Sequence, residues 1–310
     1  MQPVRAAYLA DALTQPVLAE ELRRLGVGVL DWHGLLALSP DPPRASAWAL
    51  DVWTEPELVA CHSIGLAATA LRDRQRNWSL YPAAQHRRCA LIAARLPTVK
   101  AAPLRFPAPM PTAPLGAWTL LALDRMLLSR RKTSPFVNGA CRFVEDRTGP
   151  PSRAYLKLWE ACTRLGAHPG PGDRCIDLGA APGGWSWALA QLGAEVIAVD
   201  KADLAPEVAA LPNVTLRRES AFGLQPEQEP ETDWLFSDVI AYPERLLGLV
   251  SRWIAAGRTR RIVCSIKFQG ATDHALADRF AAIAGAMLIH LAHNKHELTF
   301  MWRRPPPAPP

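Results

Sequence analysis

The sequence lacks the features that mark secreted, membrane-bound or zinc-stabilised proteins. No charged-then-apolar segment opens the chain, and no apolar run approaches the ~18 residues of a membrane-spanning helix. The six cysteines are scattered and include no C-x-x-C pair, so neither disulfides nor a zinc site is predicted. We therefore expect a cytoplasmic protein with reduced, buried thiols and no contact with a membrane.

The charge of the chain is unevenly distributed. The 310 residues are 49% hydrophobic and 21% charged, which suits one or two globular domains, and the formal net charge is +6. Residues 151–310 hold 17 basic and 17 acidic side chains, whereas residues 72–132 hold 12 basic and only 2 acidic ones. This local surplus of ten positive charges predicts a surface that binds phosphate groups.

The first part of the chain indicates a small α+β domain over residues 1–145. Apolar spacing predicts helices at residues 15–25 and 58–72, and alternation predicts half-buried strands at 29–33 and 47–53. Residues 116–123 also have the pattern of a strand.

Arginines and aromatic side chains alternate in the basic segment, residues 72–132. Such a segment can bind RNA phosphates while Trp78 and Tyr81 stack on unpaired bases. The alternative is that both aromatic residues belong to a core beneath a solvated basic face. The candidate RNA-binding residues are Arg72, Arg74, Arg76, Arg87, Arg88, Arg130, Arg131 and Lys132.

A strand, a glycine loop, a helix and a second strand follow one another in residues 175–200. The second strand ends at Asp200, the position from which an acidic side chain accepts ribose hydroxyls in βαβ nucleoside sites. The loop at 179–184 lacks the G-x-G-x-x-G spacing that places a pyrophosphate on a helix N-terminus. This disfavours a nicotinamide oxidoreductase and suits S-adenosylmethionine, which has an adenosine but no phosphates.

The remaining pattern predicts a doubly wound sheet over residues 146–302. A helix begins with Ser152 as its N-cap and ends at Gly166. Later strands and helices alternate and finish in a hairpin, which gives a Rossmann-like, seven-stranded α/β fold. These later elements are expected at residues 214–218, 233–237, 243–256, 261–266, 273–284, 287–292 and 297–302. Residues 303–310 are predicted to be a disordered, solvated tail.

Three histidines, His290, His293 and His296, lie close together before the last strand. Their spacing matches no zinc pattern, so we expect a turn with solvent-exposed imidazoles and no bound metal.

The run Asp-Leu-Gly-Ala-Ala-Pro-Gly-Gly-Trp at 177–185, preceded by Ser-Arg-Ala-Tyr-Leu-Lys-Leu at 152–158, resembles the FtsJ family of RNA ribose 2′-O-methyltransferases. Within this family the chain is most similar to the RlmM-type branch, which modifies 23S ribosomal RNA. The resemblance covers residues 145–302 and implies RNA as the partner and S-adenosyl-L-methionine as the cofactor. Members of this branch carry an RNA-binding, THUMP-type region before the catalytic domain, and residues 1–145 match that region only loosely.

The resemblance also implies a set of site residues. A Lys-Asp-Lys-Glu tetrad maps onto Lys157, Asp238, Lys267 and Glu297, with Lys267 as the general base. Ser220 stands where the family usually has an aspartate that contacts the adenine. The implied cofactor-binding residues are Ser152, Gly179, Ala180, Ala181, Pro182, Gly183, Gly184, Trp185, Asp200, Ser220 and Asp238.

The general base has to be neutral when it accepts a proton. Burial and the neighbouring Lys157 favour the neutral amine of Lys267, whereas Asp238 and Glu297 favour its ammonium form. Two other functions remain compatible with the sequence: a methyltransferase of a small molecule or protein, and a non-catalytic RNA-binding factor in ribosome assembly.

Overall fold

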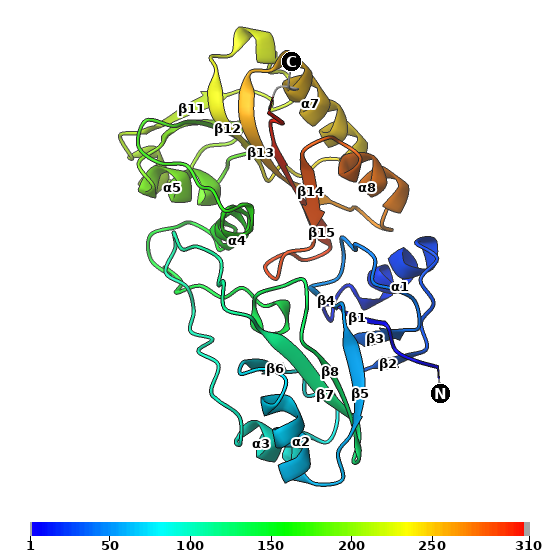
Figure 1. Ribbon diagram of the computed structural model, residues 1–310. Coiled ribbons are helices and arrows are strands. Elements are labelled where there is room, and N and C mark those ends of the chain that lie inside the picture. Colours follow the sequence, from blue (N-terminus) through cyan, green and yellow to red (C-terminus); the bar gives the residue numbers. More distant parts are fainter. Residues whose placement is uncertain (1, 307–310) are drawn as a thin grey trace. The chain divides into compact units, whose positions relative to one another are not determined.

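The chain folds into two compact units. The computed structural model (Figure 1) describes residues 2–306. Unit 1 comprises Met1–Leu104 and Met110–Arg142, and unit 2 comprises Arg105–Pro109 and Phe143–Pro310. The short segment at 105–109 thus belongs to unit 2, although the chain on both sides of it belongs to unit 1.

Unit 1 contains two four-stranded sheets within the described residues, with strand orders β2-β3-β1-β4 and β5-β8-β7-β6. Its elements are β1 (Ala6–Leu9), α1 (Gln15–Arg24), β2 (Asp31–His33), β3 (Leu36–Ser39), β4 (Asp51–Trp53), β5 (Pro56–Ala60), α2 (Ile64–Arg72), β6 (Trp78–Leu80), α3 (His86–Ala93), β7 (Gly116–Ala122), β8 (Arg125–Ser129) and the 3-10 turn Val137–Gly139.

The predicted helix at 58–72 is wrong in its first third. Residues up to Ala60 form β5, which pairs antiparallel with β8, and the helix α2 begins only after Ser63. The side chain of Ser63 accepts a hydrogen bond from the backbone N–H of Leu66 at 3.1 Å, so it caps the helix. The capping serine therefore sets the boundary that the apolar spacing alone did not reveal.

Of the two alternatives for Trp78 and Tyr81, the structure supports the one that places both in the core of unit 1, with Trp78 buried and Tyr81 partly buried. The Trp78 side chain is buried, and its indole N–H donates to the carbonyl oxygens of Leu71 and Gln75. The Tyr81 hydroxyl accepts a hydrogen bond from the backbone N–H of Leu35. Both aromatic side chains are thus committed to packing and internal hydrogen bonds.

Lys132 also faces inward, which contradicts its prediction as an RNA-binding residue. Its ammonium lies 2.6 Å from the carboxylate of Asp51, and the two side chains are 1% and 0% exposed. It also donates to the main-chain carbonyls of Ser134 and Phe136. Because the Lys132 ammonium is buried and makes its hydrogen bonds inside the domain, it cannot contact an RNA phosphate.

Unit 2 is built on a seven-stranded sheet, as far as the described residues show, with the order β11-β10-β9-β12-β13-β15-β14. All neighbouring strands are parallel except β15, which runs antiparallel to both β13 and β14. Its elements are α4 (Tyr155–Leu165), β9 (Arg174–Leu178), α5 (Gly184–Gln191), β10 (Glu195–Asp200), α6 (Pro206–Ala209), β11 (Val214–Arg218), the 3-10 turn Pro226–Gln228, β12 (Thr232–Ser237), α7 (Pro243–Ala256), β13 (Thr259–Lys267), α8 (His274–Ala281), β14 (Ala286–Ile289) and β15 (Glu297–Arg303).

Helices cover both faces of this sheet. Helices α4 and α5 contact each other on one side, and α7 and α8 contact each other on the other side (Figure 1). The central strands are consequently buried on both faces, which explains their continuous apolar runs, such as the buried stretch from Ile262 to Ile266 in β13. The predicted Rossmann-like sheet is confirmed.

The short segment at 105–109 packs onto helix α4 through Phe106. This ring stacks on Trp159 with centroids 5.0 Å apart and meets Phe143 edge-on at 6.2 Å. Trp159 also has Tyr155 against its ring, with the centroids 4.6 Å apart. The aromatic cluster fixes the helix that carries Lys157.

The first residues of the predicted tail are part of the fold, so the predicted tail begins too early. Arg303 is the last residue of β15, and the Arg304 backbone N–H donates to the carbonyl of Arg260 at 2.9 Å. Residues 307–310 lie outside the described part of the chain.

All six cysteines are buried and free of disulfides, in agreement with the predicted reduced thiols. Among the described residues no helix has the length and apolarity needed to span a bilayer.

The Lys132–Asp51 pair yields a stability prediction. Replacing Lys132 by Met leaves a buried, uncompensated carboxylate, so the free energy of unfolding should fall by about 3–5 kcal/mol. Urea titration followed by circular dichroism measures this change. Arg131→Met is the matched control, because Arg131 is exposed and its loss should cost within about 0.5 kcal/mol. Equal stability of the two variants would contradict the structural role of Lys132.

Candidate active site

The four predicted tetrad residues come from four different elements of unit 2. Lys157 lies in α4, Asp238 directly follows β12, Lys267 ends β13, and Glu297 begins β15. Because β12 and β13 are parallel, their carboxyl ends reach the same edge of the sheet. Strand β15 runs in the opposite direction, and its register pairs Glu297 with Lys267, so its first residue lies at that edge too.

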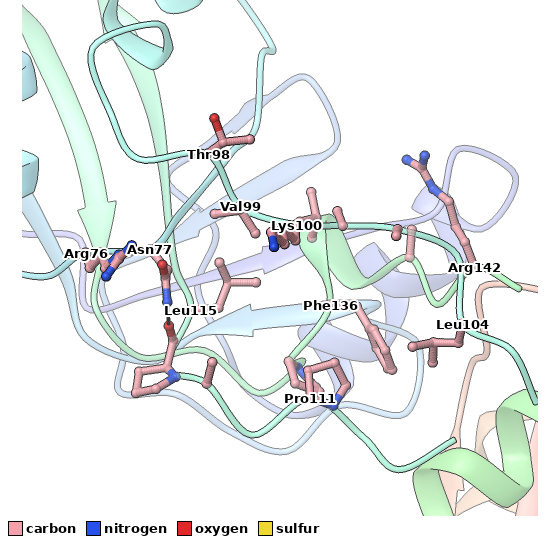
Figure 2. Close-up of a pocket in the computed structure, with 17 residues that line it drawn as sticks. Arg76, Asn77, Thr98, Val99, Lys100, Leu104, Pro111, Leu115, Phe136 and Arg142 are labelled. Atoms are coloured by element: carbon pink, nitrogen blue, oxygen red, sulfur yellow. Dashed lines mark hydrogen bonds between the residues drawn. The ribbon is translucent and has the colours of Figure 1, made fainter. Parts of the chain in front are cut away.

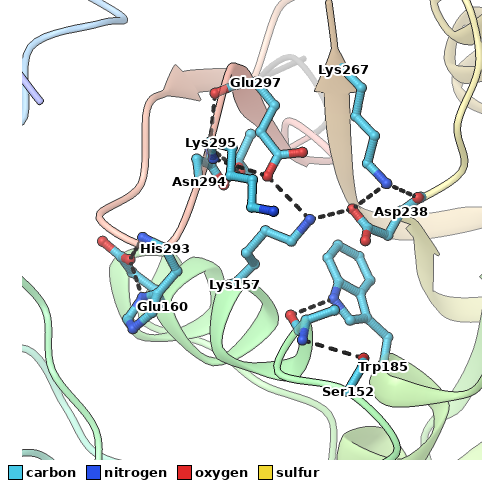
Figure 3. A network of polar contacts seen from close by, with 12 residues as sticks. Ser152, Lys157, Glu160, Trp185, Asp238, Lys267, His293, Asn294, Lys295 and Glu297 are labelled. Atoms are coloured by element: carbon cyan, nitrogen blue, oxygen red, sulfur yellow. Dashed lines mark hydrogen bonds and ion pairs between the residues drawn. The ribbon is translucent and has the colours of Figure 1, made fainter. Parts of the chain in front are cut away.

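The four side chains form one continuous chain of ion pairs (Figure 3). The Lys157 ammonium lies 2.7 Å from Oδ1 of Asp238 and 3.2 Å from Oε1 of Glu297. The Lys267 ammonium lies 3.2 Å from the same Oδ1 of Asp238 and donates to the main-chain carbonyl of Asp238. Asp238 therefore bridges the two lysines, and Lys157 bridges the two carboxylates.

Burial makes these contacts strong. The exposed fractions of the side chains are 11% for Lys157, 18% for Asp238, 10% for Glu297 and 22% for Lys267. Two ammonium groups and two carboxylates cancel in formal charge, so no net charge is buried. Lys267 is the most exposed of the four, and it also borders the neighbouring cavity.

This cavity of about 320 Å³ lies at the carboxyl ends of β9, β10, β12 and β13. Nine of the eleven predicted cofactor-binding residues line this cavity, and the other two, Gly183 and Ser220, do not. The lining residues are Ser152, Ala154, Asp177, Gly179, Ala180, Ala181, Pro182, Gly184, Trp185, Asp200, Asp238, Val239, Ile240 and Lys267.

Ser152 reaches the cavity but does not cap a helix. Helix α4 begins at Tyr155 with Ala154 in the cap position, so the predicted N-cap is wrong. A Cβ on Gly184 would lie 2.5 Å from the hydroxyl oxygen of Ser152, so a larger residue there would displace the Ser152 side chain. Gly179 has a φ of +75°, and a Cβ there would lie 2.8 Å from Val239.

Asp200 closes the cavity on the β10 side. Its two carboxylate oxygens accept hydrogen bonds from the backbone N–H groups of Ala181, at 3.0 Å, and Ala202, at 2.9 Å. These bonds fix the carboxylate beside the glycine loop. This is the position required for an acceptor of ribose hydroxyls.

Asp177 is a cavity residue that the predicted site set did not contain. Its side chain is 1% exposed; Oδ2 accepts a hydrogen bond from Ser186 at 2.7 Å, whereas Oδ1 has no hydrogen-bond partner among the described residues. The pKa of Asp177 is raised to about 7, chiefly by burial and to a smaller extent by the charges of Asp238 and Asp200, against the lowering effect of the Ser186 hydrogen bond. The feature of the sequence that could have identified Asp177 is its position at the end of β9, beside the glycine loop.

Glu160 is a second residue that sequence reasoning missed. It lies one helical turn after Lys157, is fully buried, and accepts hydrogen bonds from the backbone N–H groups of Ala292 and His293, both at 3.2 Å. Burial alone would raise the pKa of Glu160, but the His293 hydrogen bond and the Arg164 charge outweigh it and lower the pKa. Glu160 thus ties α4 to the turn that precedes Glu297, and nothing in the sequence distinguished it from an exposed helix glutamate.

The predicted solvent-exposed histidine turn is wrong. His290 is buried and its Nδ1 lies 3.0 Å from the carbonyl of Glu297, and Nδ1 of His293 lies 2.7 Å from the Glu160 carboxylate. His296 is within 2.7 Å of the Thr272 hydroxyl. The three imidazoles hold the turn before β15 in place (Figure 3 shows His293 and Glu160).

The predicted RNA-binding arginines differ in their surroundings. Arg74 is paired with Glu57 and half-buried, and Arg88 donates to the carbonyl of Cys61. The other five remain exposed on unit 1: Arg72, Arg76, Arg87, Arg130 and Arg131. With Lys132 buried, the basic surface is smaller than the charge count suggested.

The sheet order, together with a cavity at the carboxyl ends of its parallel strands, defines the class of unit 2: it is a Rossmann-like α/β domain with a ligand site at the strand ends. More particularly, residues 150–300 match the FtsJ-like methyltransferase family. The resemblance predicted from the sequence is thereby confirmed for this part of the chain.

Curated relatives match about half of the chain. The ribosomal RNA large subunit methyltransferase M of Halorhodospira halophila is 36% identical over 162 residues, covering 50% of this chain and 47% of the relative. The protein of the same name from Aromatoleum aromaticum is 38% identical over 164 residues, covering 48% and 44%. The chain therefore spans about half the length of these relatives. The methyltransferase assignment supports the predicted methyl donor, S-adenosylmethionine.

Asp177 yields a prediction for cofactor binding. With a pKa of about 7, about half of its carboxyl is protonated at neutral pH. The sulfonium and ammonium charges of S-adenosylmethionine favour the ionised form, so binding should release on the order of half a proton at pH 7. Calorimetry in buffers of different ionisation enthalpy measures this release, which Asp177→Asn should abolish. Identical proton release in wild type and Asp177→Asn would contradict the assignment.

Proposed function

We propose that the protein is an S-adenosylmethionine-dependent RNA ribose 2′-O-methyltransferase that acts on large-subunit ribosomal RNA in the cytoplasm. The names of the curated relatives support the ribosomal substrate. The observation that carries the proposal is the ion-pair chain Glu297–Lys157–Asp238–Lys267, which ends at the wall of the cofactor cavity.

The contacts assign different roles to the two lysines. Lys157 is held by two carboxylates and is less exposed than Lys267, so it fixes the positions of Asp238 and Glu297. Lys267 contacts a single carboxylate oxygen, at 3.2 Å, and borders the cavity. Of the two lysines, only Lys267 lines the cavity, which is where a base has to reach the substrate hydroxyl.

The reaction requires an aligned hydroxyl and an acceptor for its proton. Bound S-adenosylmethionine supplies the methyl group. The neutral Lys267 amine accepts the proton of the ribose 2′-hydroxyl as the new C–O bond forms and the C–S bond breaks. Asp238 receives the resulting ammonium through the contact already present, and Lys157 holds Asp238 in place. Positioning by this network supplies the near-attack geometry on which such transfers depend.

Unit 1 would supply RNA affinity. The exposed arginines of its basic segment, residues 72–132, can neutralise backbone phosphates without reading the base sequence. The pairing of Arg74 with Glu57 and the burial of Lys132 remove those two side chains from this role. RNA binding by unit 1 thus depends on the remaining basic side chains.

The role of Lys267 can be tested with two substitutions. Lys267→Met removes the base, and methyl transfer to ribosomal RNA should fall by ~10²–10⁴. Lys267→Arg should be equally impaired, since a guanidinium keeps the positive charge but does not deprotonate in the working range. Transfer of radiolabelled methyl groups measures both rates.

Cofactor affinity, measured by calorimetry, is the control for both variants and should stay within a few-fold of wild type. Arg279→Met, a change at an exposed arginine of α8, should leave the transfer rate unaltered. Near-normal turnover of Lys267→Arg would contradict the general-base role, because only the charge would then matter.

A further inference from the structure

Unit 1 contains a cavity of its own, of about 460 Å³. It is formed by residues 76–77 before β6, the proline-rich segment between α3 and β7, and the residues that follow β8 (Figure 2). Its volume lies in the range of small-molecule sites, which is ~300–1,000 Å³. A single nucleotide is a ligand of that size.

The charged side chains of this cavity all have the same sign. Arg76, Lys100 and Arg142 line it, and no carboxylate does. All three are exposed, and no ion pair involving them occurs among the described residues. In Figure 2 they follow one another along the cavity, with Lys100 between the two arginines. This contrasts with Arg74, a near neighbour of Arg76 in sequence, which is neutralised by Glu57.

The rest of the cavity wall is largely apolar. Val99, Leu104, Leu115, Phe136 and Val137 line it, together with several prolines. A row of unpaired cations beside an apolar wall fits a ligand with a flat, weakly polar ring and flanking anions. A nucleotide in single-stranded RNA has both parts, whereas a duplex keeps its bases stacked and inaccessible.

We propose that this cavity receives an unpaired nucleotide of the RNA substrate. The base lies against the apolar wall, and Arg76, Lys100 and Arg142 bind the phosphates on either side. This inference rests on the proposed function as an RNA-modifying enzyme, and it names the place where unit 1 holds the substrate. It also gives a role to Lys100 and Arg142, which the charge surplus alone did not single out.

Fluorescence anisotropy with a labelled single-stranded RNA of about a dozen nucleotides tests the proposal. The variant Arg76→Gln/Lys100→Gln/Arg142→Gln should bind at least about tenfold more weakly at moderate salt. Its plot of log affinity against log salt should be flatter by about two units, because each lost single-strand phosphate contact accounts for ~0.7. A matching RNA duplex should bind wild type and variant with similar affinity.

The matched control is Arg5→Gln/Arg24→Gln/Arg44→Gln, which removes the same charge from exposed arginines of unit 1 outside both the cavity and the basic segment 72–132. This control should keep most of the wild-type affinity and salt slope. Equal losses in the two triple variants would overturn the proposal, because net charge and not the cavity would then set the affinity.

Photo-crosslinking with 4-thiouridine in the same RNA locates the base directly. Crosslinked peptides should contain residues 99–104, 111–115 or 135–137, which form the apolar wall. Crosslinks confined to other parts of unit 1 would overturn the proposal. Methyl transfer by the wild-type protein separates the two hypotheses: if transfer persists while the cavity variant binds RNA like its control, only the cavity proposal fails.

Discussion

The site depends on one carboxylate that holds two ammonium groups. Oδ1 of Asp238 lies 2.7 Å from the Lys157 ammonium and 3.2 Å from that of Lys267. In a site this buried, two lysines side by side would repel each other, and each would be costly to desolvate. The negative charge of Asp238 offsets both the repulsion and the cost of desolvation, and the charge of Glu297 balances the second ammonium group. The network therefore holds both lysines at one edge of the sheet without burying a net formal charge.

The sheet explains how such a carboxylate comes to lie there. Parallel strands deliver Asp238 and Lys267 to one edge, and the reversed last strand adds Glu297. This part of the architecture could be predicted from the sequence, because strand ends and the glycine loop leave local patterns. The residues that support the site could not be predicted. Glu160 holds the turn before Glu297 although the two segments are more than 130 positions apart in the sequence, and only packing reveals that contact. Asp177 was overlooked although the loop that follows it was recognised.

In unit 1, counting charged residues did not identify which basic side chains are accessible to RNA. The surplus of basic residues predicted a phosphate-binding surface, but not which side chains stay available. Lys132 is buried on Asp51, a residue 81 positions away, and Trp78 is buried in the core. Conversely, Arg142 lies outside the predicted basic segment yet lines the cationic cavity. Burial and ion pairing depend on contacts between distant segments, so a local reading of the sequence cannot rank these residues.

The most direct test of the central claim is the position of the transferred methyl group. Unmodified large-subunit ribosomal RNA is incubated with the protein and S-adenosylmethionine labelled in its methyl group, and the RNA is then hydrolysed in alkali. A methyl group on the 2′-oxygen blocks cleavage of the adjacent phosphodiester, so the account predicts that the label appears in alkali-resistant dinucleotides. Label recovered in mononucleotides would place the methyl group on a base and contradict ribose methylation.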